Sequence, residues 1–442
     1  MTTSSDVLER SRPSAPSRLP RVLNGGGSHG RVSLRDHLER FGYPPSPERR
    51  GDRAAFVDMI DRSGLRGRGG GGFPTGQKLR AVARGRRRPV VVANGAEGEP
   101  LSAKDKVLCV TAPNLVLDGA VLAAAAVGAT EAVVVVDRFA HDARVAIENA
   151  IEERRVARLD RVALRTVDSP TRFLAGEESP LVHWLNGGPA KPTYVPPRPF
   201  QRGVGGRPTL VQNVETLAHV ALIARFGDEW FRGIGLASEP GSALVTIRGA
   251  VRHPGVLEIA LGTPMAAVIE ATGGVTEEIS AFLVGGYFGT WLPAADGWGL
   301  ALSDESIRAA GGGLGSGVVV ALPATSCGVV ETAAVVRYLA EETAGQCGPC
   351  VHGLNAIADA VASIADGDVD RDTVARLRRW IGDVSGRGAC HYPDGAVRFV
   401  ASALDVFADE IDRHAQGRAC SLARRTQALG VPHPAHREWG WR

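Results

Sequence analysis

The chain has 442 residues, 44% hydrophobic and 22% charged, and carries a formal net charge of +3. This length exceeds one ordinary hydrophobic core, so we expect two to four domains, and the small net charge argues against nucleic-acid binding. No apolar run is long enough to span a membrane and residues 1–20 lack the apolar core of a secretory signal, so we expect a cytoplasmic protein without direct membrane insertion.

The first half of the chain has the pattern of an α/β domain. Residues 1–47 mix Ser, Pro, Gly and Arg and predict a disordered N-terminal tail, in which the amphipathic piece Ser33 to Phe41 can dock on the body. Between residues 48 and 237, the apolar runs 89–93 and 132–136 flank a helix-like segment at 114–127. Buried apolar runs that alternate with helices predict a largely parallel sheet.

The second half changes character twice. Residues 238–322 contain strand-like runs at 243–247 and 256–259 and a helix-like stretch at 264–272, which predict a small α+β domain. From 323 to 415, apolar residues at steps of three and four predict four antiparallel helices. A four-helix bundle of this kind can carry a cofactor between its loops. Residues 416–442 are expected to form a C-terminal tail.

A glycine-rich loop is the strongest local signal. Six glycines lie within nine positions starting at Gly64, and Phe73, Pro74 and Thr75 follow, with Lys78 near the start of an expected helix. Glycines allow backbone N–H groups to approach a phosphate or a flat ring. A flexible linker is the plain alternative, but it would not need the ordered residues that follow. The glycine spacing fits neither a Walker nor a Rossmann fingerprint.

Three polar clusters are candidates for the same site. Residues 94–100, Asn-Gly-Ala-Glu-Gly-Glu-Pro, follow the strand-like run 89–93, where ligands bind in α/β sheets. Residues 175–180 place Glu177 and Glu178 at an expected helix start, and residues 212–216 set Gln212 beside Asn213. A solvated turn and simple helix capping are the plain alternatives for the first two clusters.

Five of the six cysteines lie in the last third of the chain. Cys347 and Cys350 form a Cys-x-x-Cys pair and Cys390 follows later, a pattern that can bind a metal or an iron–sulfur cluster. A dithiol redox pair and structural zinc are the alternatives. Cys109 stands alone in an apolar segment and is expected to be a buried, inert thiol.

Together these motifs resemble the flavoprotein subunit of NADH:quinone oxidoreductase (complex I) and its relatives in NAD-linked hydrogenases and formate dehydrogenases. The resemblance covers about residues 50–415, with the glycine loop, residues 94–100, 176–178 and 212–216 in the family's order. It implies an FMN-binding α/β domain, a β-grasp soluble-ligand-binding domain and a helical [4Fe–4S] domain. In that family NADH reduces the flavin, which passes electrons to the cluster.

The resemblance also assigns residues to roles. Phe73 and Glu99 fall on the NADH side, with Glu99 as the candidate catalytic residue. The cluster falls to Cys347, Cys350 and Cys390. The FMN-binding positions are Gly67, Arg68, Gly69, Gly70, Lys78, Asn94, Gly176, Glu177, Glu178, Asn213 and Thr216.

Several positions depart from the family pattern. Ala96 replaces an Asp near the flavin, Ala81 replaces an aromatic residue that helps to hold adenine, and Val195 and Arg198 replace a Lys and a Phe. A lost aromatic contact is worth about 0.5–1.5 kcal/mol and a lost charge-assisted hydrogen bond about 1.5–3 kcal/mol. We therefore expect weakened NADH binding.

The cluster motif lacks its first cysteine, because Ala344 stands in that position. A fourth iron would be held by Cys327, by His352, by an exogenous ligand, or be missing as in a three-iron form. Cys327 also has a plain role as a core residue, which we favour slightly.

The expected function is that of an oxidoreductase subunit that passes electrons between FMN and an iron–sulfur cluster, with NADH as a weakened donor. Expected partners are a ferredoxin or a thioredoxin-like iron–sulfur subunit, and docking to a membrane complex is compatible with the family. An electron-transfer adaptor that exchanges electrons with a protein and not with NADH, and a cofactor-free assembly scaffold, are the alternatives.

Overall fold

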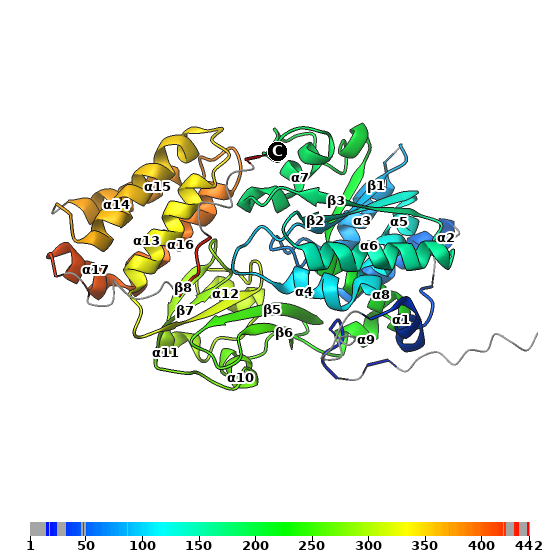
Figure 1. Ribbon diagram of the computed structural model, residues 1–442, viewed down its shortest axis with the longest axis horizontal. Helices are drawn as coiled ribbons and strands as arrows, with labels where there is room; N and C mark the ends of the chain where they lie inside the picture. The colour runs from blue at the N-terminus through cyan, green and yellow to red at the C-terminus, as the bar shows by residue number, and fades with distance from the viewer. Residues whose placement is uncertain are drawn as a thin grey trace, which may run out of the picture.

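The structure is a computed structural model that describes residues 15–16, 18–23, 32–45, 47, 50–85, 87–370, 372–418, 420, 428–432 and 440–441. In Figure 1 a helical region lies on one side, a helix-covered parallel sheet on the other, and a second sheet below and between them. The parts follow the chain in order, as the change of sequence pattern predicts.

The first sheet is parallel and has the strand order β3-β2-β1-β4. Asn94 near the end of β1 pairs with Asn213 at the end of β4. Because the strands are parallel, their carboxyl ends meet at one edge, where polar groups from distant segments can converge. The strands are β1 (Val90–Gly95), β2 (Glu131–Asp137), β3 (Ala163–Ser169) and β4 (Thr209–Asn213).

Helices bury both faces of this sheet, which explains the unbroken apolar runs of β1 and β2. Val91 and Val134 pack into a core with α2, α3, α5 and α8, whereas Val90 and Val133 pack with α7 on the other face. The helices are α2 (Arg50–Ser63), α3 (Thr75–Ala83), α4 (Lys104–Thr111), α5 (Pro113–Val127), α6 (His141–Val156), α7 (Glu178–Leu185) and α8 (Val214–Phe226).

The short helix α1 (Leu34–Phe41) docks on this domain, as the amphipathic pattern predicts. Ser33 and Asp36 form a capping box at its start. His37 Nε2 lies 2.7 Å from Asp118 Oδ2 on α5, and Arg154 of α6 lies 2.8 Å from the other Asp118 oxygen. Arg225 of α8 also pairs with Asp118, so the buried carboxylate joins four helices. Within the expected tail, residues 1–14, 17, 24–31 and 46 lie outside the described residues.

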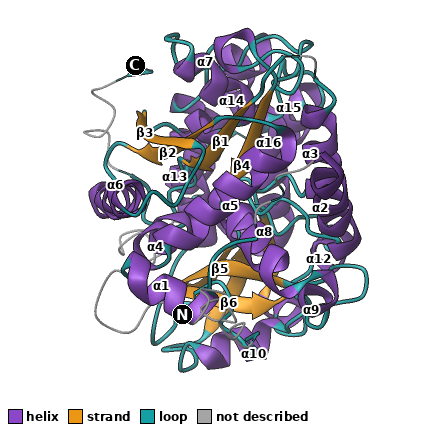
Figure 2. Ribbon diagram, turned by 90° about the vertical axis from the view of Figure 1, so that its right-hand side faces the viewer, coloured by secondary structure: helices purple, strands orange, loops and turns teal. Residues whose placement is uncertain are grey.

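The second sheet is mixed, with strand order β6-β5-β9-β7-β8. In Figure 2 it lies below the first sheet, with α4, α5 and α8 seen between them. The predicted runs 243–247 and 256–259 are the antiparallel pair β5 and β6. Its elements are β5 (Ser242–Gly249), β6 (Gly255–Ala260), α10 (Met265–Ala271), β7 (Ile279–Val284), β8 (Thr290–Pro293), α11 (Ala294–Gly297), α12 (Asp304–Ala309) and β9 (Val318–Pro323), and α9 (Asp228–Arg232) precedes it.

The last region is helical, as expected. The helix predicted to run through Val397 to Ile411 is interrupted at Phe407, which ends α16 and begins α17. The buried Phe407 ring packs against Trp291 with ring centroids 5.1 Å apart. The helices are α13 (Gly328–Glu341), the π-helical turn η3 (Pro349–Gly353), α14 (Leu354–Asp366), α15 (Thr373–Val384), α16 (Tyr392–Val406) and α17 (Ala408–Ala415).

The described parts of the C-terminal segment pack on all three regions. The Glu331 carboxylate of α13 accepts the backbone N–H groups of Ala428 and Leu429, at 2.6 and 3.0 Å. Leu429 in turn accepts the Tyr287 hydroxyl. The Arg172 guanidinium lies 4.5 Å from the Trp441 ring centroid, which brings the end of the chain beside the first domain.

Within the described ranges, no single helix is long and apolar enough to cross a membrane. The bent pair α4 and α5 reaches the required length and composition together, with an angle of 96° between the two helices.

Candidate functional site

The glycine-rich loop connects α2 to α3 and closes on itself. The Gly67 N–H donates to the Phe73 carbonyl and the Thr75 N–H to the Leu65 carbonyl, both at 2.9 Å. Gly70 has a φ of 98°, a left-handed conformation that favours glycine. The Phe73 side chain at the end of the loop is 55% exposed, so its ring is free to receive a ligand.

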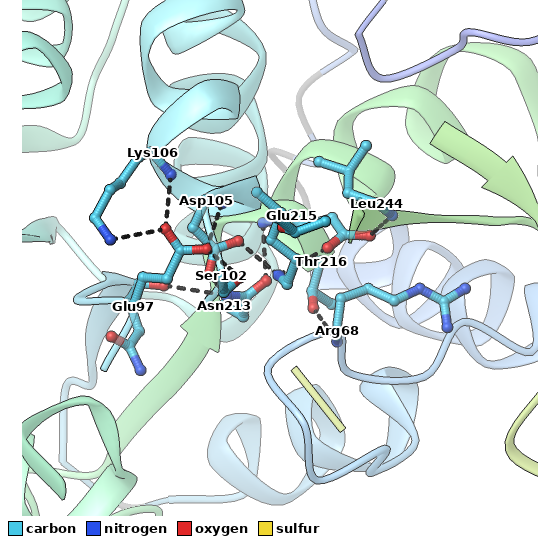
Figure 3. Close-up of polar contacts among 12 residues, drawn as sticks. Arg68, Glu97, Ser102, Asp105, Lys106, Asn213, Glu215, Thr216 and Leu244 are labelled. Atoms are coloured by element: carbon cyan, nitrogen blue, oxygen red, sulfur yellow. Dashed lines mark hydrogen bonds and ion pairs between the residues drawn. The ribbon is translucent and has the colours of Figure 1, made fainter. Parts of the chain in front are cut away.

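Arg68 attaches this loop to α8, the helix that follows the last strand of the first sheet. Its backbone N–H donates to the Thr216 hydroxyl at 2.8 Å, across the gap between the loop and α8 (Figure 3). Its guanidinium Nε and Nη2 are buried and have no hydrogen-bond partner in the described part of the chain. Burial lowers the pKa of Arg68, although Glu215 and Glu239 oppose the shift. Buried donors without acceptors are costly and point to an absent acceptor.

A cavity of about 40 Å³ adjoins Arg68, between the glycine loop and the second sheet. Gly67, Gly70 and Gly315 line it together with Lys104 and Glu215. A Cβ on Gly67 would have its nearest neighbour at 3.6 Å, and one on Gly71 would meet nothing within 4 Å. The loop therefore leaves open space along its backbone.

The strand-end clusters meet at the carboxyl edge of the first sheet, as predicted. Asn94 Nδ2 donates to the Gly176 carbonyl at 2.7 Å, and Asn94 Oδ1 accepts the Ala96 N–H. Asn213 Nδ2 donates to Asp105 Oδ2 at 2.7 Å, while its Oδ1 caps α8 by accepting the Glu215 N–H. Three segments that are far apart in the sequence thus form one polar edge.

A buried charge network lies beneath this edge. Lys104 Nζ lies 2.7 Å from Asp105 Oδ1 and 2.8 Å from Glu215 Oε2, and Glu215 Oε1 accepts the Leu244 N–H of β5. Burial raises the pKa of Asp105 to about 6. Burial also acts to raise the pKa of Glu215, but Lys104, His219 and Arg68 together outweigh it and bring this pKa to about 2. The network fixes Asn213 and ties both sheets together.

Lys104 and Glu215 were not among the predicted site residues. Glu215 lies within the cluster 212–216, whereas Lys104 follows the cluster 94–100, and a Lys-Asp pair at the start of an apolar helix is the local signal that points to it. Glu97 is held in the same way: its carboxylate accepts the Ser102 hydroxyl at 2.5 Å and the Asp105 N–H at 3.0 Å (Figure 3). These residues act on the edge through Asn213 and Asp105.

Glu99 faces the second sheet's domain. Its carboxylate accepts the Tyr287 N–H at 2.9 Å and the Leu101 N–H at 3.2 Å. Burial raises the pKa of Glu99 to about 7. A Cβ added to Gly286 would lie 2.5 Å from the carboxylate, so the backbone of that loop approaches closely. Glu99 thus holds the junction of two domains and has a pKa suited to proton exchange near neutrality.

The carboxylates at the start of α7 face different groups. Glu178 Oε1 lies 3.1 Å from Lys78 Nζ, so this pair joins α7 to α3. Glu177 retains substantial solvent contact, yet crowding by protein atoms raises its pKa to about 7, while His391 opposes the shift. A side chain that is both accessible and crowded lies at the wall of a concave surface. Burial raises the pKa of Cys390 and Glu177 adds to the shift, so the start of α7 lies close to the thiols of the helical region.

Cys347, Cys350 and Cys390 gather at the end of the helical region nearest α7. The Cys350 N–H donates to the Cys347 carbonyl at 3.1 Å at the start of the π-helical turn. Burial raises the pKa of Cys350 to about 12, and the nearby Cys347 and Cys390 add to the shift. Ala344 offers a methyl group, and its carbonyl accepts Lys191 Nζ at 2.8 Å.

Comparisons with known proteins decide the family. The NADH-quinone oxidoreductase F 2 subunit of Rhizobium meliloti (strain 1021) is 30% identical, with 83% of this chain and 90% of that protein covered. The NADP-reducing hydrogenase subunit HndC of Solidesulfovibrio fructosivorans is also 30% identical, over 83% of this chain and 77% of its own length. The chain belongs to the family of NADH-quinone oxidoreductase F subunits.

Family descriptions and solved structures agree with this assignment. The Nuo51 FMN-binding domain matches residues 60–222, the SLBB domain residues 244–286, and the NADH-ubiquinone oxidoreductase-F iron-sulfur binding region residues 331–414. The air-oxidized NAD+-reducing [NiFe]-hydrogenase superposes with a TM-score of 0.79 at 28% identity, over 91% of this chain and 67% of that chain. The resemblance drawn from the motifs is therefore confirmed.

As a member of the NADH-quinone oxidoreductase F subunit family, the chain has residues that fit both FMN and an iron–sulfur cluster, the two groups that the family descriptions name. The orphaned Arg68 donors and the open glycine loop suit an anionic, flat cofactor such as FMN. In the described ranges, the Sγ atoms of Cys347, Cys350 and Cys390 do not all lie within 4.8 Å of one another. Thiolates are the usual ligands of iron–sulfur clusters, and Cys347 and Cys390 both lie close enough to Cys350 to add to the rise in its pKa.

The position of Cys327 argues against it as the fourth ligand of that cluster. It lies at the N-terminal cap of α13, whereas Cys347 follows the other end of this helix. A helix of 14 residues is roughly 21 Å long, so the two thiols are at opposite ends of the helical region. His352 is exposed in the turn after Cys350.

Proposed function

We propose that this chain is the electron-transferring subunit of an oxidoreductase, in which FMN and an iron–sulfur cluster are held by one polypeptide. The convergence of the glycine loop, Asn94, Gly176 and Asn213 at one sheet edge carries the proposal. The cysteines lie near that edge, because Glu177, which follows Gly176, is close enough to Cys390 to add to the rise in the pKa of this thiol that burial causes. When bound, FMN would supply the chemistry of accepting a hydride, that is two electrons and a proton, and of releasing the electrons one at a time to a cluster held by this chain.

The protein's own residues supply binding and orientation. The backbone of Gly67, Gly69 and Gly70 admits a flat or phosphorylated group, and Arg68 and Lys78 supply positive charge. Asn94 and Asn213 present amide groups whose positions are fixed by Gly176 and Asp105. Thr216 holds the loop against α8. Glu177 and Glu178 form the opposite wall.

The proposed NADH side includes Phe73 and Glu99. The exposed Phe73 ring can stack on a flat base. Ala81, Val195 and Arg198 replace family contacts, so we propose that NADH binds weakly. Tyr194 and Val195 are 87% and 42% exposed, in a loop that offers little enclosure to a ligand.

For the cluster, we propose Cys347, Cys350 and Cys390 as ligands of a [4Fe–4S] or three-iron cluster. The fourth corner differs from that of the family because Ala344 carries no ligand atom. A site with three thiolates should lose one iron more readily than a site with four.

Our proposal includes a protein partner, since the related proteins are named as subunits of NADH-quinone oxidoreductase and of hydrogenases. A ferredoxin or a thioredoxin-like iron–sulfur subunit would fit next to the cluster. The same proposal covers the finer fold description: domains at 48–237, 238–322 and 323–415, a β-grasp second domain, and a four-helix core.

The alternative function is an electron-transfer adaptor that keeps its cofactors but exchanges electrons with a protein and not with NADH. The exposed, altered segment 194–198 is the observation that favours it. The two functions differ in one measurement, which is flavin reduction by NADH.

The test is anaerobic purification followed by acid release of the chromophore and assay of iron and sulfide. We expect about one FMN per chain, and three or four irons with matching sulfide after reconstitution. Gly70→Glu should abolish FMN binding, because a side chain at a φ of 98° is strained and blocks the loop. Gly382→Ala, at an open position on α15, is the matched control. Protein without FMN, iron or sulfide after reconstitution would instead indicate a scaffold.

A further inference from the structure

A second group of metal-binding side chains lies at the far end of the helical region. Cys327, His414 and Cys420 bring their Sγ, Nε2 and Sγ atoms within 4.8 Å of one another. In the part of the chain that the structure describes, this is the group of three Cys, His, Asp or Glu side chains with such close spacing. Cys327 and His414 are 2% and 0% exposed, while Cys420 is partly exposed.

The geometry is that of a tetrahedral site. Cys327 Sγ and His414 Nε2 lie 3.5 Å apart. Zinc bonds of about 2.3 Å to sulfur and about 2.0–2.1 Å to nitrogen, at a tetrahedral angle, place these two atoms roughly 3.5 Å apart. The two ligand atoms thus already stand at the separation that one metal ion requires.

The orientation of His414 is fixed from its other nitrogen. Nδ1 lies 2.9 Å from the Ala365 carbonyl oxygen at the end of α14. A carbonyl can only accept, so Nδ1 carries the proton and Nε2 presents its lone pair to the thiols. Metal-binding histidines are commonly held by a second hydrogen bond of this kind.

We propose that Cys327, His414 and Cys420 bind one zinc ion, with a fourth position open to water or an exogenous ligand. Thiolate and imidazole ligands are the set that zinc prefers. A simple thiol–imidazole hydrogen bond would explain the approach of Cys327 to His414. It gives no reason for the Cys420 thiol, six positions beyond His414, to turn toward the same pair.

The ion would fasten the C-terminal segment to the helical region. Cys327 lies at the start of α13, His414 in the last turn of α17, and Cys420 beyond it. Glu410 already joins α17 to α13, since its carboxylate accepts the Gly328 N–H at 3.2 Å. The zinc ion adds a link just before the segment whose Leu429 reaches Glu331 and Tyr287. Its loss should release that segment.

The test measures zinc in the full chain, purified anaerobically without chelator and with its cluster reconstituted. Elemental analysis should give about one zinc per chain in the parent, in Cys350→Ser and in Cys109→Ser. Cys420→Ser and His414→Gln should lose at least nine-tenths of the zinc. Cys420 is partly exposed and outside the helices, so its variant should fold even if changes at the buried Cys327 and His414 do not.

Two further readouts separate the outcomes. Cobalt substitution should give a sulfur-to-metal absorption band near the intensity of two thiolates in the parent, and this band should be lost together with the metal in Cys420→Ser. Release by protease of the C-terminal segment that contains Leu429 should become faster in Cys420→Ser but not in Cys109→Ser. A Cys327–Cys420 disulfide in the anaerobic parent, zinc retained in Cys420→Ser, or no zinc or cobalt binding by the parent would each overturn the proposal. Cys350→Ser should lack the iron–sulfur cluster but keep its zinc. The zinc measurement on this variant therefore does not depend on the proposed flavin and iron–sulfur function.

Discussion

The Arg68 backbone N–H and the Thr216 hydroxyl oxygen lie 2.8 Å apart although 148 positions separate the residues in the chain. This bond holds the glycine loop against the first turn of α8, next to Asn213 at the end of β4. The geometry of the flavin site therefore depends on a contact between two motifs and not on either motif alone.

Replacement of Thr216 by Val should weaken FMN binding. The substitution keeps the side-chain shape but removes the acceptor for Arg68, and an unpaired buried N–H costs about 1–3 kcal/mol. We expect the dissociation constant for FMN to rise about 5- to 150-fold, measured by quenching of flavin fluorescence on titration of flavin-free protein. Thr325→Val, at an exposed site, is the control. Equal affinities in Thr216→Val and the parent would show that the bond does not position the loop.

NADH should reduce the flavin slowly, and the rate of reduction should level off only at high NADH concentration. The double change Val195→Lys with Arg198→Phe restores the charge and ring that the family pattern has at these positions, so it should tighten NADH binding. Each restored contact is worth about 0.5–3 kcal/mol. Stopped-flow bleaching of the flavin at increasing NADH concentration measures the change. Rapid bleaching of the parent by micromolar NADH would contradict the expectation of weak binding.

Cys350→Ser and Cys327→Ser should behave in opposite ways toward the iron–sulfur cluster. Cys350 lies with Cys347 and Cys390, whereas Cys327 lies at the opposite end of α13. After anaerobic reconstitution, Cys350→Ser should show no cluster signal by electron paramagnetic resonance. Cys327→Ser should retain the signal of the parent. A lost signal in Cys327→Ser, with secondary structure unchanged by circular dichroism, would place this thiol at the cluster after all.

Stability should decline as the pH rises toward neutrality, in part because of Glu99. Burial raises the pKa of Glu99 to about 7 in the folded chain, so the folded state binds more protons than the unfolded state between about pH 4.5 and 7. The free energy of unfolding therefore falls across this window. Glu99→Gln cannot titrate, so its loss between pH 5 and 8 should be smaller by roughly 1–3 kcal/mol. Urea unfolding at both pH values measures the difference, and identical losses would show that Glu99 is charged throughout.

The sequence predicted the parts of the fold that depend on local pattern. The apolar runs 89–93 and 132–136 became the central strands β1 and β2, because strands covered on both faces need continuous apolar side chains. The glycine loop and the clusters at Asn94, Gly176 and Asn213 could also be predicted from local sequence. Each of them keeps an unusual composition within a few residues.

What the sequence did not predict depends on contacts between distant segments. The break at Phe407 lies within a regular apolar pattern, and packing against Trp291 accompanies it. The pairing of Lys104 with Glu215 joins residues 111 positions apart, which no local pattern reports. The docking of Leu429 and Trp441 follows a stretch without apolar periodicity.

Electron transfer from the flavin to the cluster tests the proposed function most directly. The measurement is the electron paramagnetic resonance signal of the reduced cluster in anaerobic, reconstituted protein frozen after addition of millimolar NADH. We expect a signal in the parent and none in Gly70→Glu, which should keep its iron but lack FMN. Equal signals with and without FMN, or no cluster signal in the parent in both the oxidised and the dithionite-reduced state, would contradict the proposal.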